Sequence, residues 1–99
     1  MGTITAHVDA DFADLIPDYL AHRRQDVQLL KEALAQGDFA TLRTLGHKMK
    51  GTGGGYGFPD ISDIGRAIQA AAENQESAII GEQTERLARY LAEVTVIVD

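Results

Sequence analysis

The chain has 99 residues, of which 44% are hydrophobic, and this size and composition predict one globular domain over residues 1–99. It has no cysteine, which excludes disulfides and cysteine-ligated metal, and its net charge of −6 makes nucleic acid an unsuitable partner. No apolar run approaches the roughly 20 residues of a membrane span, and no basic-then-apolar start suggests a signal peptide. We therefore expect a soluble cytoplasmic protein with no membrane partner.

The first apolar stripe is short and consists of Phe12, Leu15 and Ile16. Pro17 follows it, and because proline suits the first turn of a helix, a longer helix is expected to begin there. Gly37 is a natural stop for that helix. The buried side of the longer helix is expected to carry Tyr19, Leu20, Val27, Leu30 and Leu34.

Two further helices flank a glycine-rich stretch, residues 51–57. Asp38 is a good N-cap for the second helix, which enters the glycines after Lys50, and Pro59 suits the first turn of the third, which ends near residues 73–76. Their apolar residues recur at helical spacing. These residues are Phe39, Leu42, Leu45 and Met49 in the second helix, and Ile61, Ile64, Ile68 and Ala71 in the third.

A fourth helix is expected from about Ser77, with its apolar side formed by Ile80, Leu87, Tyr90, Leu91 and Val94. Residues 94–98 are β-branched and would also suit a strand, but no partner strand is evident, so we read them as helix. Four amphipathic helices with short connections predict an all-α fold. We expect an antiparallel four-helix bundle, up-down-up-down, with a short extra N-terminal helix over about residues 9–16.

His47 is predicted to point away from the core. At roughly 100° per residue, Leu42, Leu45 and Met49 define the core side of the second helix, and His47 lies roughly 170° from it. A packed histidine is therefore excluded by helix geometry. A merely incidental surface histidine remains possible on direction alone.

The neighbours of His47 favour a reactive role. Lys50 lies three residues on, within reach of groups on the ring, and Gly51 lies four residues on, where a side chain would crowd the ring. Gly54 continues this bare strip, while Gly55 and Gly57 suit the turn. An exposed neutral imidazole is a competent nucleophile near pH 7, and a nearby ammonium would offset the charge of a phosphoryl group.

The spacing His47-x-x-Lys50-Gly51-x-x-x-x-x-Gly57 resembles the signature of the histidine-containing phosphotransfer (HPt) domain family of phosphorelays. The resemblance implies a left-handed four-helix bundle in which His47 exchanges a phosphoryl group with the phosphoaspartate of a response-regulator receiver domain. It also implies that Lys50 supports the phosphoryl group and that Gly51 admits the receiver. Gln69 matches the polar residue that lies beside the imidazole, although an ordinary boundary glutamine is an equal interpretation.

On this interpretation the chain is a carrier without kinase or phosphatase activity of its own. Its partners would be receiver domains, with a hybrid histidine kinase as a further candidate, and a monomer is the default expectation. The receiver would hold the divalent metal, so we expect no cofactor or metal site here. The docking surface would comprise Arg43, Thr44, Lys48, Lys50, Gly51 and Gly54, with Arg66 and Gln69 at its edge.

Two alternatives remain open. One is a non-catalytic helical module that binds receiver domains without phosphotransfer. The other is a bundle that binds a metal or small ligand, but His7, His22 and His47 are too far apart in sequence to share a helix turn. His7 and His22 are expected to be solvated surface residues. Neither a P-loop nor a dinucleotide-binding fingerprint is present.

Overall fold

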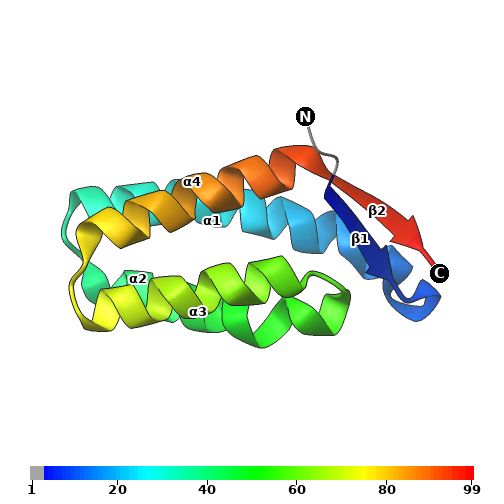
Figure 1. The fold of residues 1–99 in the computed structure, drawn as a ribbon, viewed down its shortest axis with the longest axis horizontal. Coiled ribbons are helices and arrows are strands. Elements are labelled where there is room, and N and C mark those ends of the chain that lie inside the picture. The colour runs from blue at the N-terminus through cyan, green and yellow to red at the C-terminus, as the bar shows by residue number, and fades with distance from the viewer. Residues whose placement is uncertain (1–3) are drawn as a thin grey trace.

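The structure is a computed structural model that describes residues 4–99. This range contains four α-helices, named α1 (Ile16–Ala35), α2 (Phe39–Thr52), α3 (Pro59–Glu73) and α4 (Ser77–Glu93). Two short 3-10 helices, η1 (Ala10–Leu15) and η2 (Gly54–Tyr56), and two strands, β1 (Ile4–Val8) and β2 (Val94–Val98), complete the described chain. Figure 1 shows the helices packed side by side along the longest dimension, with the two strands together at one end.

Local signals set the helix boundaries as the sequence predicts. Pro17 lies in the first turn of α1, and Gly37 follows its end with a φ of +66°. Asp38 caps α2 by accepting hydrogen bonds from the backbone N–H of Thr41 (3.1 Å) and from its hydroxyl (2.6 Å). These hydrogen bonds lower the pKa of Asp38. Pro59 occupies the first turn of α3.

The predicted apolar stripes of all four helices contribute to the core, with Tyr19, Leu20 and Leu30 from α1. The fully buried side chains include Leu42 and Met49 of α2, Ile61, Ile64 and Ile68 of α3, and Ile80 and Leu87 of α4. Phe58, in the loop before α3, is also completely buried and stacks on the Tyr19 ring at a centroid distance of 5.7 Å. No periodic pattern marks this loop residue, so sequence reasoning missed it.

The N-terminal segment packs less than its sequence suggests. Where a short helix is predicted over about residues 9–16, the chain forms η1, and Asp9 caps it by accepting a hydrogen bond from the backbone N–H of Asp11. Of the predicted stripe only Ile16 is buried, at 5% exposure, while Phe12 and Leu15 are 40% and 50% exposed. This segment therefore contributes little to the core.

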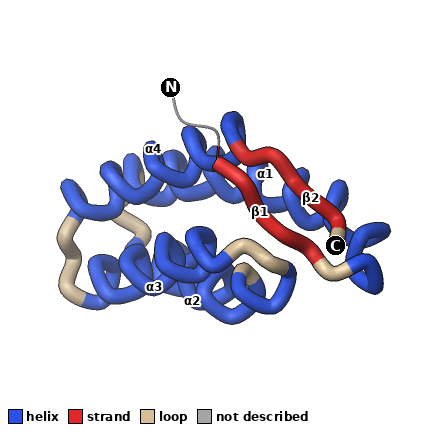
Figure 2. Tube along the Cα trace, turned by 45° about the vertical axis from the view of Figure 1, so that its right-hand side comes forward, coloured by secondary structure: helices blue, strands red, loops and turns tan. Residues whose placement is uncertain are grey.

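The prediction of helix for residues 94–98 is wrong. These residues form β2, which pairs in parallel with β1 in a register that runs from Ile4↔Val94 to Val8↔Val98. Figure 2 shows the two strands side by side. The β-branched run suits a strand. Its partner strand lies near the other end of the described chain, where no sequence pattern predicted a strand. One face of β1 packs on the core through Ala6 and Val8.

Two helical glycines bring α2 and α3 into close contact. A Cβ atom added to Gly46 would lie 2.7 Å from the backbone nitrogen of Gln69, and one added to Gly65 would lie 2.5 Å from that of Lys50. Neither space admits a methyl group, so the two backbones touch at this crossing. The α2–α3 pair is the most extensive helix contact in residues 4–99.

We predict that Gly65→Ala lowers the free energy of unfolding by about 1–3 kcal/mol, because the added methyl group forces the two helices apart. Chemical denaturation measures this change. Gly81→Ala is the matched control, because its Cβ would meet only Leu34 Cδ2 at 3.9 Å. That control should be neutral or more stable by up to about 1 kcal/mol. Equal stability of the two variants would contradict the close crossing.

Candidate functional site

His47 lies on the outer side of α2. Its side chain is exposed, whereas Leu42, Leu45 and Met49 on the opposite side of the helix are buried. The direction predicted from helix geometry is therefore found in the structure. His7 on β1 and His22 on α1 are also exposed, as predicted, and each of the three histidines stands on a different element.

His47 borders a surface hollow of about 210 Å³ between α2 and α3. Arg43 and Thr44 from α2 and Gln69 from α3 complete its lining. The close crossing at Gly46 holds the backbone of Gln69 against α2, which places the glutamine beside the histidine. Because one water occupies roughly 30 Å³ of liquid, the hollow has room for several waters or a phosphoryl group.

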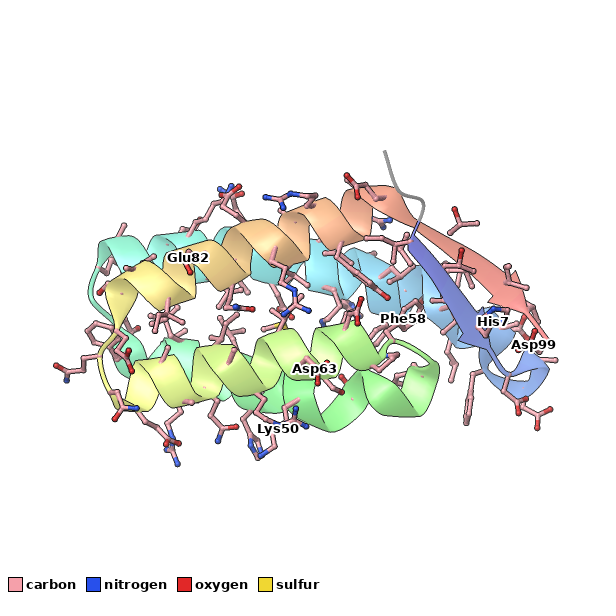
Figure 3. All side chains as sticks on the ribbon, viewed as in Figure 1. His7, Lys50, Phe58, Asp63, Glu82 and Asp99 are labelled. Atoms are coloured by element: carbon pink, nitrogen blue, oxygen red, sulfur yellow. The ribbon has the colours of Figure 1, made fainter. Side chains whose placement is uncertain are left out.

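The cations near His47 differ in their partners. Arg43 Nε donates to Glu73 Oε1 at 3.1 Å, and Arg66 Nη1 donates to Asp63 Oδ1 at 3.0 Å. Lys50 is exposed on the outer side of the α2–α3 pair (Figure 3), and it takes part in none of the ion pairs formed within residues 4–99. Lys50 is thus a cation three residues from His47 without a competing carboxylate in that range.

The glycines after His47 divide into open and packed positions. A Cβ on Gly51 would meet nothing within 4 Å, and one on Gly54 would meet only Ser62 Oγ at 3.6 Å. Gly53 is instead packed, because its Cβ would lie 2.6 Å from the backbone nitrogen of Ser62. Gly57 has a φ of +95°, and a side chain there would collide with the His7 carbonyl of β1. A side chain at Gly51 would therefore enter open space, and one at Gly54 would meet only Ser62.

Ser62 stabilises the end of α2 through hydrogen bonds. The sequence did not predict this role. The Ser62 hydroxyl donates to the Lys50 carbonyl (3.0 Å) and accepts from the Gly54 N–H (2.8 Å). Thr52 has a comparable role, because its Oγ1 donates to the Lys48 carbonyl (3.0 Å) and lies 3.1 Å from the Tyr19 hydroxyl. These bonds fix the last turn of α2, which carries Lys50.

The predicted docking residues are almost all accessible to solvent. Arg43, Thr44, Lys48, Lys50, Gly51, Gly54 and Arg66 are exposed, and Gln69 is half-buried. Burial raises the pKa of Asp26 on α1, and the charge of Lys48 is one of several that oppose this rise.

Within residues 4–99 no group of three or more histidine, cysteine or acidic side chains could hold a metal ion. No helix in the same range is both long enough and apolar enough to span a bilayer.

The family model described as Hpt domain matches residues 14–95. The chain belongs to the Hpt domain family. Hpt domains act in phosphotransfer within two-component systems and interact with response-regulator receiver domains. The match contains all four helices and stops inside β2, so β1 and most of β2 lie outside it. No curated protein and no solved structure matched the chain.

We predict that Gly51→Leu slows phosphotransfer with a receiver domain at least about tenfold, because the new side chain occupies the open strip beside His47. The free energy of unfolding should be unchanged or rise by up to about 1 kcal/mol, because the added atoms meet nothing and glycine is unfavourable within a helix. Rapid-quench transfer assays and denaturation measure the two effects. Gly51→Ala, which adds one methyl group, should retain most of the wild-type rate. A wild-type rate in Gly51→Leu would contradict the role of open access.

Arg23 and Asp26 of α1 form an ion pair whose side chains are only 13% and 10% exposed. Asp26 of α1 is 7% exposed, and its Oδ2 accepts a hydrogen bond from Arg23 Nε at 2.8 Å. The Arg23 guanidinium also lies over the Tyr19 ring, 4.8 Å from its centroid. Burial raises the pKa of Asp26 above its ordinary value of 3.8, although Arg23, Lys48 and His22 act in the opposite direction. The folded protein therefore favours the neutral acid relative to the unfolded chain.

This raised pKa gives a pH prediction with a definite sign. The stability that Asp26 contributes is present below pH 3.8 and is lost as the pH rises through its higher folded pKa. Asp26→Asn keeps an acceptor for Arg23 but cannot ionise. The free energy of unfolding of wild type minus that of Asp26→Asn should therefore fall from acid to neutral pH. A difference that stays constant or rises would contradict the raised pKa.

Proposed function

We propose that this chain is a phosphoryl carrier in which His47 exchanges a phosphoryl group with the phosphoaspartate of a receiver domain. The observation that supports this best is the exposed imidazole at the edge of the α2–α3 hollow, next to a bare approach at Gly51. Lys50 supplies a nearby positive charge to which the structure assigns no ion-pair partner within residues 4–99.

The proposed transfer moves one phosphoryl group between two nucleophiles. A ring nitrogen of neutral His47 attacks the phosphorus, and the N–P bond forms as the bond from phosphorus to the aspartate oxygen breaks. The electron pair of that bond leaves with the aspartate carboxylate, and the second ring nitrogen of His47 keeps its proton. The phosphoryl group carries most of two negative charges, which Lys50 offsets. The reverse step returns the group to a receiver.

The carrier needs little chemistry of its own. In-line transfer depends on positioning and charge neutralisation, and the receiver brings the divalent ion. We therefore infer that the chain has no kinase or phosphatase activity. We also infer that it works as a monomer in the cytoplasm, with an up-down-up-down helix order, and that a hybrid histidine kinase is among the proteins that can carry its receiver partner.

We predict that incubation with a phosphorylated receiver labels this chain at one acid-labile site, and that His47→Gln abolishes the label. His7→Gln and His22→Gln are matched controls, because both histidines are exposed on other elements and should be dispensable. Radiolabel transfer followed by acid treatment measures the outcome.

A label that survives in His47→Gln would refute the assignment of the acceptor. Binding to receivers without transfer from any of them would instead identify the chain as a non-catalytic receiver-binding module.

A further inference from the structure

Four polar side chains form two adjacent rows across the α2–α3 contact. Arg43 and His47 are four residues apart on α2, and Gln69 and Glu73 are four residues apart on α3. Residues four apart share one face of a helix. Arg43 faces Glu73 in one row, with 3.1 Å between Nε and Oε1, and His47 shares the hollow with Gln69 in the next. Arg43 also lines that hollow, so one side chain belongs to both rows.

The Arg43–Glu73 ion pair is suited to exchange partners. The two side chains are 61% and 49% exposed, and exposed ion pairs contribute little to stability. The bond uses Nε, which is one of the five N–H donors of the guanidinium group. Little therefore holds Arg43 in place when a stronger anion appears beside it.

Phosphorylation of His47 would create such an anion one helical turn from Arg43. A phosphoryl group carries up to two negative charges and three acceptor oxygens, whereas Glu73 carries one charge. Arginine also binds phosphate oxygens in a bidentate manner.

We propose that Arg43 is a second phosphoryl-binding residue, which Glu73 holds in the unmodified protein and releases to the phosphoryl group on His47. Glu73 thereby competes with the phosphoryl group for Arg43 and lowers the affinity of the site for it. This inference rests on the proposed function and adds a residue to it beyond Lys50.

The equilibrium constant for transfer from one phosphorylated receiver to this chain tests the proposal. Docking contacts change the rates in both directions equally, so they cannot alter this constant. Arg43→Gln should lower it roughly two- to fivefold, the range of an exposed charge pair, and Glu73→Gln should raise it by a similar factor. In the Arg43→Gln background, Glu73→Gln should have no effect, because the competition has been removed.

Lys31→Gln and Glu85→Gln are matched controls for net charge. These residues form an exposed ion pair between α1 and α4, with 3.8 Å between Lys31 Nζ and Glu85 Oε1. Both controls should keep the wild-type constant. Circular dichroism establishes that every variant is folded before transfer is measured.

The outcomes separate this inference from the function on which it rests. Wild type that accepts no phosphoryl group would overturn the proposed function. Wild type that is phosphorylated with the same equilibrium constant as Arg43→Gln would overturn only the role of Arg43. An undiminished effect of Glu73→Gln in the Arg43→Gln background would show direct repulsion by the carboxylate and would overturn the exchange.

Discussion

The close approach of α2 and α3 at Gly46 and Gly65 is the contact on which the site depends. The two backbones lie so near that no side chain fits between them. Everything that surrounds His47 from the neighbouring helix, including Gln69, follows from this contact. A helical glycine costs about 1 kcal/mol relative to alanine, and the burial of the α2 and α3 apolar stripes offsets that loss. The bundle thereby holds two helices rigidly while their outer faces remain open.

The outer face of α2 combines a last turn that hydrogen bonds hold in place with an open space at Gly51. Ser62 and Thr52 tie down the last turn, so Lys50 projects from an anchored backbone. Gly51 leaves open space on the same side. The motif glycine Gly57 serves a different purpose, since its left-handed backbone passes beneath the His7 carbonyl of β1. The glycine-rich stretch thus contributes to access, to helix packing and to the attachment of the strand pair.

Local sequence signals predict much of this fold. Capping by Asp38, the positions of Pro17 and Pro59, and the helical spacing of apolar residues gave the helix boundaries and the direction of His47. The parallel pairing of residues 4–8 with 94–98 joins the two ends of the described chain, and no local pattern encodes such a partner. The glycine crossing and the Arg43–Glu73 pair likewise depend on which helix faces lie together. Arg43 and Arg66, predicted only as docking residues, each have an acidic partner on α3.

The central claim is that the exposed imidazole of His47 accepts a phosphoryl group. Its most direct test is phosphorus–proton correlation NMR of the wild-type chain after phosphoryl transfer from a phosphorylated receiver domain. The account predicts one phosphoryl resonance that correlates with the ring protons of His47, while the rings of His7 and His22 stay unmodified. A phosphoryl group found on either of those rings, or no phosphoimidazole at all, would contradict it.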